Sequence, residues 1–409
     1  MPKYEIQNPE KIKILYPITS LLPGGVQAYL VNLITGLDRE RFDPVVAYGL
    51  EGAPLYELKA AGVRVVKIAG LKKSISPMDD LRALINIIKL IKAENPMIIH
   101  TNMSKANLIG RLAGTICRTP LIIMTAHGWA NFLRYYYKSL LKRIIQRGVE
   151  KALVPLGDHY ILVSYADRER LLKLNMLPPD RITVIRNGID FRIFRNDLKN
   201  SEKKQELGLS PDLPMIVMVG NLFVSKAPLD YFRAAKIVLE NWGPSNFILV
   251  GDGKLRLRVE EMIDDFSLRE NCRVLGYRSD VPEILSAADL FLLPTLREGL
   301  SISLLEAMAA GLPIVTTDIA ENRELLKEEK NGFLVSPHRP DLLAEGIMKI
   351  LDDPDMATGM GERNRKLVED EFGVRNMVEK TQQLYLKLLD SVSAGKSPAQ
   401  RRWARSIGS

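Results

Sequence analysis

The chain has 409 residues, of which 46% are hydrophobic and 26% charged, and it contains two cysteines. This length exceeds a single ordinary core and predicts two or three domains. Two cysteines are too few for a disulfide-stapled secreted fold, so we expect a reducing, cytoplasmic setting. We expect no secretory signal, because the first ten residues are polar, and no apolar run reaches the roughly 18 residues of a membrane span.

Charge is distributed unevenly along the chain. Residues 1–195 hold 29 Lys and Arg against 16 Asp and Glu, whereas residues 196–409 hold 28 against 33. A basic first half suits a phosphorylated ligand or an anionic membrane, and the sequence has none of the usual nucleic-acid-binding motifs. We therefore expect two domains that face different partners, and no nucleic acid.

Short apolar runs alternate with helical patterns through the first half. The run that begins at Lys11 is followed by a turn with two glycines and by a helical pattern from Val26 to Gly36. Alternation of this kind predicts a parallel sheet with helices on both faces. The expected strands are 11–16, 43–48, 63–68, 97–100, 121–125 and 160–163.

The alternation pauses over residues 190–214, which are polar and end in prolines, and then resumes. The chain is thus predicted to form two Rossmann-like doubly wound domains, 1–195 and 196–374, that face a central cleft, with ligands beyond the carboxyl ends of the strands. A basic tail, 393–409, is expected to be disordered or to rest on a membrane surface. The expected strands of the second half are 215–220, 247–251, 274–275, 290–293, 314–316 and 332–335.

Two segments of the first half carry candidate chemistry. Gly24 and Gly25 lie between the first strand and its helix, where backbone N–H groups suit a phosphate, although an ordinary Pro-Gly turn is the alternative. His127 follows another strand and precedes Gly128, so it has either a role in the cleft or a structural one. No His or Cys pair has the spacing of a metal site, so we expect no metal.

Two cations of the second half follow strands. Lys226 comes shortly after Gly220 and Asn221, where it could hold a diphosphate as a point charge. Arg278 follows a later strand. Each is weak evidence alone, because most Lys and Arg side chains simply face water.

The most informative stretch runs from Leu293 to Pro313. A strand leads into a loop with Glu298, and a helix then continues to Gly311. The backbone of residues 299–301 (Gly299, Leu300 and Ser301) is predicted to point N–H groups at an anion. In the alternative interpretation, Ser303 and Glu306 form a helix capping box that needs no ligand.

These motifs together resemble glycosyltransferase family 4, which comprises retaining enzymes of the GT-B fold. The most specific feature is Glu298 followed eight residues later by Glu306 and then by Gly311 and Pro313. The resemblance extends over about residues 11–390. It implies that 1–195 is the acceptor-side domain, that 196–374 is the nucleotide-sugar donor-binding domain, and that a final helix, at about 375–392, crosses back onto the first domain. The supporting motifs, in chain order, are Gly24-Gly25, Ala126-His127-Gly128, residues 187–190, Gly220 with Lys226, residues 251–253 and Gly276.

The resemblance implies a role for each matching residue. His127 and Glu298 would contact the transferred sugar as catalytic residues, Lys226 and Gly25 would bind the donor diphosphate, and Glu306 would bind the ribose. The remaining donor-binding positions that it implies are Gly24, Asn221, Arg278, Gly299, Leu300 and Ser301. Many members have Arg in place of Asn221 and Gly in place of Ala227, so we expect a variant form of the diphosphate clamp.

The expected function is retaining transfer of a hexose or N-acetylhexosamine from a UDP-sugar to a polysaccharide, glycolipid or lipid-linked acceptor, as in cell-envelope polysaccharide synthesis. Lys226 and helix N-termini would stabilise the departing diphosphate, so no metal and no cofactor are expected. The alternatives are a nucleotide-sugar epimerase of the same fold and a non-catalytic nucleotide-sugar-binding subunit.

Residues 131–151 form a basic amphipathic pattern with aromatic and aliphatic residues between the cations. Helices of this kind lie on anionic membranes, and the alternative is a solvated face packed on the sheet. Peripheral association with the cytoplasmic face of the inner membrane is thus one of two interpretations. The cations are Lys138, Lys142, Arg143, Arg147 and Lys151.

Overall fold

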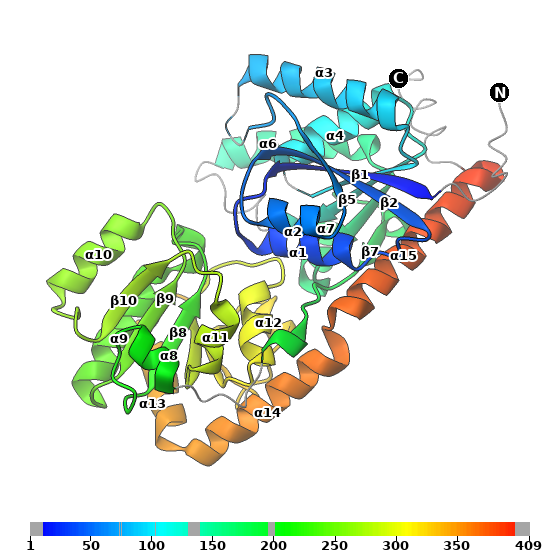
Figure 1. Ribbon diagram of the computed structural model, residues 1–409. Helices are drawn as coiled ribbons and strands as arrows, with labels where there is room; N and C mark the ends of the chain where they lie inside the picture. Colours follow the sequence, from blue (N-terminus) through cyan, green and yellow to red (C-terminus); the bar gives the residue numbers. More distant parts are fainter. Residues whose placement is uncertain are drawn as a thin grey trace. The chain divides into compact units, whose positions relative to one another are not determined.

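The computed structural model describes residues 11–72, 74, 76–102, 104–129, 140–194 and 201–396. The chain divides into two compact units. Unit 1 comprises Met1–Asn187 and Val374–Ser409, and unit 2 comprises Gly188–Gly373. Each unit is a parallel sheet with helices on both faces (Figure 1), which confirms the predicted pair of doubly wound domains.

Unit 1 is built on a seven-stranded sheet in the order β3-β2-β1-β4-β5-β6-β7, and all neighbouring strands are parallel. Apolar runs predicted six of these strands. The seventh, β7, escaped prediction because it has only three residues, all half-buried. The strands are β1 (Ile12–Ser20), β2 (Phe42–Leu50), β3 (Arg64–Lys67), β4 (Ile98–Thr101), β5 (Leu121–Ala126), β6 (His159–Leu162) and β7 (Ile182–Val184).

Successive residues of a strand serve opposite faces of this sheet. Leu15 and Ile99 pack against α3 and α4, whereas Tyr16 and His100 contact Tyr385 of α15 on the other face. The helix α15 therefore covers the centre of the unit 1 sheet. The helices of unit 1 are α1 (Gly25–Thr35), α2 (Pro54–Ala60), α3 (Pro77–Glu94), α4 (Ser104–Ile116), α6 (Leu140–Leu153), α7 (Tyr165–Lys173) and α15 (Val374–Ser391).

Unit 2 is built on a six-stranded parallel sheet in the order β10-β9-β8-β11-β12-β13. All six strands were predicted from apolar runs. They are β8 (Met215–Val219), β9 (Asn246–Val250), β10 (Cys272–Gly276), β11 (Leu290–Leu293), β12 (Ile314–Thr317) and β13 (Phe333–Val335). The helices are α8 (Ser201–Glu206), α9 (Pro228–Asn241), α10 (Arg256–Asp265), α11 (Val281–Ser286), α12 (Ile302–Ala309), α13 (Pro340–Asp352) and α14 (Pro354–Glu371).

The strand order reverses once in each sheet, between β1 and β4 in unit 1 and between β8 and β11 in unit 2. Loops at such a point diverge to opposite faces and leave a crevice beyond the carboxyl ends of the strands, where doubly wound proteins bind ligands. The segments that follow β1, β4, β8 and β11 are therefore the candidate ligand-binding segments.

Two predicted segments lie partly outside the described residues. The tail begins in a π-helical turn, Val392–Lys396, that follows α15, and residues 397–409 are outside the description. Of the basic segment 131–151, residues 131–139 are also outside it, and the remainder lies in α6. In the part of the chain that is described, no helix is both long and apolar enough to cross a bilayer.

Candidate functional site

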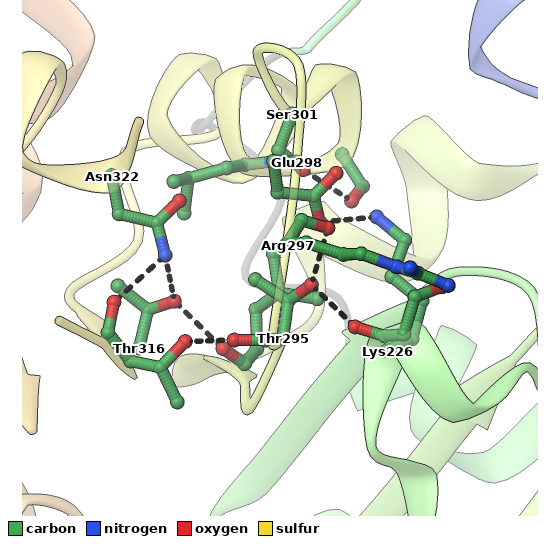
Figure 2. A network of polar contacts seen from close by, with 12 residues as sticks. Lys226, Thr295, Arg297, Glu298, Ser301, Thr316 and Asn322 are labelled. Carbon is green, nitrogen blue, oxygen red and sulfur yellow. Dashed lines mark hydrogen bonds and ion pairs between the residues drawn. The ribbon is translucent and has the colours of Figure 1, made fainter. Parts of the chain in front are cut away.

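Lys226 and Glu298, which lie 72 positions apart in the sequence, form an ion pair at the switch point of unit 2. Lys226 ends a short 3-10 turn after β8, and Glu298 lies in the loop after β11 (Figure 2). Only 18% of the lysine side chain and 9% of the glutamate side chain are exposed. An ammonium has three N–H donors, so Lys226 can hold Glu298 and still bind an anion.

Hydrogen bonds tie the loop of Glu298 to the turn of Lys226. The Thr295 hydroxyl donates to the Ser225 carbonyl at 3.0 Å, and the Leu296 N–H donates to the same carbonyl at 2.8 Å. Behind the loop, the Asn322 amide donates to the Thr316 hydroxyl at 2.9 Å (Figure 2). The ion pair is therefore held in place by its own supporting bonds, as a preorganised site requires.

Ser301 is the N-cap of α12, because its Oγ accepts from the Leu304 N–H at 3.4 Å. Ser303 lies inside the helix and contacts the Ser301 hydroxyl at 3.2 Å. The capping box proposed for Ser303 and Glu306 is therefore wrong, since a capping serine must precede the first helical residue. Glu306 is left without a capping role.

Glu306 is half-buried, and its carboxyl group has no hydrogen-bond or ion-pair partner within the described ranges, whereas its backbone carbonyl accepts from the Ala310 N–H. Burial raises the pKa of its carboxyl group to about 7. A carboxylate without a partner keeps its full capacity to accept hydrogen bonds, and burial makes those bonds stronger. Its predicted role as a ribose ligand stays a prediction.

Arg278 is held by carboxylates of unit 2. Its Nε and Nη2 donate to Asp280 at 2.7 and 2.6 Å, and its Nη2 lies 3.6 Å from a carboxylate oxygen of Glu206. The Arg278 hydrogen bonds, aided by Lys203, keep the pKa of Asp280 well below its usual range. Next to this group, Asn221 accepts from the Tyr277 hydroxyl at 3.3 Å. Arg278 and Asn221 remain predicted donor ligands.

Ala227, which follows the lysine, has a positive φ of 46°. This left-handed conformation crowds the Cβ of an L-residue, and glycine adopts it freely. The backbone therefore gives the physical reason why glycine suits this position, and Ala227 occupies it with strain.

Gly24 and Gly25 form the junction of β1 and α1. Gly24 immediately precedes the helix, and Gly25 is its first residue and is exposed. The Gln27 amide donates to the Ser20 carbonyl at 2.9 Å and closes the turn. Both the phosphate-binding interpretation and the simple turn fit this geometry, so the role of these glycines stays a prediction.

His127 lies directly after β5, beside the switch point of unit 1. Its Nε2 donates to Oδ1 of Asn102, which follows β4, over 3.3 Å. The ring also packs edge-on against Tyr29, with centroids 4.8 Å apart. Burial lowers the pKa of His127 to about 4, so the imidazole is neutral at pH 7. With Nε2 as the donor, Nδ1 is left as a hydrogen-bond acceptor.

A buried polar network, which the sequence did not predict, lies behind His127. The Tyr29 hydroxyl is 3.2 Å from that of Thr125, which is 2.7 Å from Nε2 of His100. Nδ1 of His100 is 2.5 Å from the hydroxyl of Tyr385 in α15. Burial lowers the pKa of His100 to about 3, so this ring is neutral too. No local pattern signals the network, because it joins residues 285 positions apart.

Two doubly wound units, each with polar side chains at its switch point, define the GT-B class of glycosyltransferases. Two family models match the chain: "Glycosyltransferase Family 4" over residues 23–192 and "Glycosyl transferases group 1" over residues 199–367. The structure of Anabaena HepE in complex with UDP and glucose superposes with a TM-score of 0.79 at 21% identity, over 91% of this chain and 99% of that one. This likeness confirms the predicted fold.

The chain belongs to glycosyltransferase family 4. It is 31% identical, over 93% of its length and 98% of the relative's, to the Escherichia coli UDP-Gal:alpha-D-GlcNAc-diphosphoundecaprenol alpha-1,3-galactosyltransferase. It is also 25% identical, over 87% and 93% of the two chains, to the Campylobacter jejuni N,N'-diacetylbacillosaminyl-diphospho-undecaprenol alpha-1,3-N-acetylgalactosaminyltransferase. The resemblance inferred from the motifs is thereby confirmed, and the protein is a glycosyltransferase.

Proposed function

We propose that this glycosyltransferase moves a hexose or N-acetylhexosamine from a UDP-sugar to a lipid-linked sugar acceptor, with retention of configuration. The observation that carries the proposal is the likeness to the E. coli enzyme, which extends over nearly the full length of both chains. That enzyme uses UDP-galactose and an N-acetylglucosamine diphospholipid. Galactose is therefore the first donor sugar to test here.

Charge stabilisation at the leaving group supports this chemistry. Cleavage of the sugar–phosphate bond builds positive charge on the ring and negative charge on the departing diphosphate. In the proposed mechanism Lys226 and the backbone N–H groups of residues 299–301 stabilise the diphosphate, so no metal and no other cofactor takes part. Glu298 accepts a hydrogen bond from a hydroxyl of the transferred sugar. The acceptor substrate attacks the sugar from the same face that the diphosphate leaves.

The surface of α6 supports a peripheral membrane association. Leu141, Ile144, Ile145 and Val149 follow one another at helical spacing, and 48–66% of each is exposed. Exposed apolar residues on a basic amphipathic helix insert at the headgroup boundary of anionic bilayers. In this proposal the enzyme meets its lipid-linked acceptor at the cytoplasmic face of the inner membrane.

Liposome pelleting tests the membrane association. The wild type should pellet with phosphatidylglycerol vesicles in a salt-sensitive way, and Ile144→Ser with Ile145→Ser should stay in the supernatant. As a control, serine replaces Leu257 of α10, which is more exposed than either isoleucine. Equal pelleting of all three proteins, or none by the wild type, contradicts the association.

The transfer reaction is tested with UDP-galactose, UDP-glucose and UDP-N-acetylglucosamine, and with a short-chain N-acetylglucosamine diphospholipid as the acceptor. Mass spectrometry detects the product, and the coupling constant of its new anomeric proton reports an α-linkage, hence retention. Activity should survive EDTA. Conversion of the UDP-sugar to an epimer without transfer would replace the proposal by the epimerase alternative.

A further inference from the structure

His100 lies at the centre of the buried polar network of unit 1 and is bonded through both of its ring nitrogens. Its Nδ1 is 2.5 Å from the hydroxyl of Tyr385 in α15, and its Nε2 is 2.7 Å from the hydroxyl of Thr125 in β5. The His100 ring is fully buried, and Thr125 is 1% exposed. Because the ring is neutral, one of its nitrogens donates and the other accepts. His100 therefore links α15 to β5 through the strand β4 that carries it.

The side chain of Tyr385 is itself held from two sides. Its hydroxyl lies 3.0 Å from that of Tyr16 in β1, and its ring packs edge-on against Phe42 of β2, with centroids 6.0 Å apart. Tyr16 and Tyr385 are fully buried, and Phe42 is 1% exposed. A buried network whose polar groups are hydrogen-bonded to one another is rigid. The helix α15 therefore holds His100 in a fixed position.

The two strands that His100 joins also carry His127 and its hydrogen-bond partner. His100 lies two positions before Asn102 at the end of β4, and Thr125 lies two positions before His127 at the end of β5. Side chains two positions apart in an extended strand lie on the same face of the sheet. The bond from His100 to β5 therefore lies one side-chain repeat before the bond between Asn102 and His127. It fixes the spacing of the two strand ends across which that second bond forms.

The aromatic contact of the His127 ring leads back to the same network. Its edge-on partner Tyr29 lies in α1 and is fully buried. The Tyr29 hydroxyl is 3.2 Å from that of Thr125, which also bonds His100. The Tyr29 contact and the Asn102 bond of His127 thus both depend on one threonine hydroxyl.

We propose that His100, held by Tyr385 of α15, is a positioning residue that fixes the orientation and the tautomer of His127. The inference rests on the proposed function and on the contact with the transferred sugar that the family resemblance implies for His127. A ring held with Nε2 toward Asn102 presents Nδ1 as its acceptor, whereas a rotated ring presents a donor or a carbon in that place. The network thus determines which atom of His127 meets the sugar.

Two variants each remove one of the hydrogen bonds of His100. Thr125→Val removes the hydroxyl beside Nε2 and keeps the β-branched shape, and Tyr385→Phe removes the hydroxyl beside Nδ1 and keeps the ring. The matched control is Thr183→Val, because Thr183 of β7 bonds Nε2 of His159 at 2.8 Å in the same sheet, two strands away from β5. The control loses the same kind of bond without touching the network.

In the transfer assay, Thr125→Val and Tyr385→Phe should each lower kcat about fivefold, which corresponds to about 1 kcal/mol, without a change in the KM for UDP-galactose. Thr125→Ser keeps the hydroxyl and should recover most of the kcat that the valine variant loses. Thr183→Val should have the kcat of the wild type.

Nitrogen-15 NMR of the imidazole rings gives a readout that a purely structural role would not change. The chain has four histidines, which single substitutions assign. In the wild type, His127 should show one neutral tautomer with its proton on Nε2. Thr125→Val and Tyr385→Phe should show a mixture of both tautomers at His127, whereas Thr183→Val should show the wild-type signal.

An unchanged His127 signal in both network variants overturns the inference. An equal loss of kcat in Thr183→Val also overturns it, because the loss would then reflect general destabilisation of unit 1. If Tyr385→Phe does not fold, Thr125→Val and its recovery by serine decide. If the wild type transfers no sugar from any UDP-sugar, the proposed function fails, and the NMR spectra decide alone whether the network fixes the His127 ring.

Discussion

The affinity for a UDP-sugar should depend on pH through Glu306. Burial raises the pKa of this carboxyl group from 4.5 to about 7. In the proposed site the ionised carboxylate accepts a hydrogen bond from each of the two ribose hydroxyls. The protonated carboxyl group can accept fewer hydrogen bonds. Affinity should therefore fall as the pH drops through 7.

The size of the effect follows from the fraction of Glu306 that is ionised. With a pKa of about 7, that fraction is about nine-tenths at pH 8 and about one-tenth at pH 6. If only the ionised form binds the ribose pair, the Kd for UDP-galactose rises about tenfold across this interval. Binding at pH 6 should also release a proton, because the ligand favours the ionised form.

Titration calorimetry with UDP-galactose is the appropriate assay. A terminal phosphate monoester titrates near pH 6, so free UDP would confuse the result, whereas the diphosphate of the sugar nucleotide is blocked at both ends. Buffers of different ionisation enthalpy report the released proton. The reasoning fails if Kd is flat between pH 6 and 8, or if Glu306→Gln retains the wild-type pH dependence.

Stability provides an independent check on the same carboxyl group. Because its pKa is higher in the folded chain than the ordinary value of 4.5, folding favours the protonated form. That contribution is fully present below pH 4.5 and is lost as the pH rises through about 7. Glu306→Gln, which is always neutral, should therefore raise Tm relative to the wild type at pH 8 and have little effect at pH 4.5.

Three substitutions probe the other groups. Glu298→Gln keeps the shape of the side chain but removes its charge. We expect kcat to fall about a hundredfold or more, while calorimetry still detects binding of UDP-galactose. Near-normal turnover would refute the assignment. Tyr29→Phe keeps the ring against His127 and loses the hydroxyl bond to Thr125, so thermal unfolding should show a loss of about 1 kcal/mol and kcat should fall less than tenfold; an unchanged Tm would argue against the bond. Ala227→Gly relieves the left-handed strain and should stabilise by about 0.5–1 kcal/mol after the entropy of glycine is counted; destabilisation in urea titrations would contradict this.

The sequence predicted the architecture because buried parallel strands are continuous apolar runs. Twelve of the thirteen strands could be placed in this way, and only β7 could not, since Ile182–Val184 is short and half-buried. The approach of Lys226 to Glu298 was not predicted, and the observed strand order explains it. Both residues come after strands, β8 and β11, that are neighbours in the sheet, so their loops meet at one edge.

The groups behind the site were beyond sequence reasoning for two physical reasons. Tyr385 meets His100 only because α15 packs across the sheet of unit 1, and no local spacing reports such a contact. The N-cap of α12 could not be chosen between Ser301 and Ser303, because both are good capping residues two positions apart. Only the backbone bond from Leu304 to Ser301 decides between them.

The two units differ in electrostatic character, and the difference bears on where the acceptor's proton goes. Unit 2 offers charged or ionisable groups, Lys226, Glu298 and Glu306, which suit a diphosphate and a ribose. Unit 1 offers neutral ones, because burial keeps the pKa of His127 near 4. A base of that strength is poorly matched to proton removal at neutral pH. Glu298 is already paired with Lys226, so the departing phosphate, whose monoester pKa is near 6, is the better proton acceptor, as the proposed same-face attack requires.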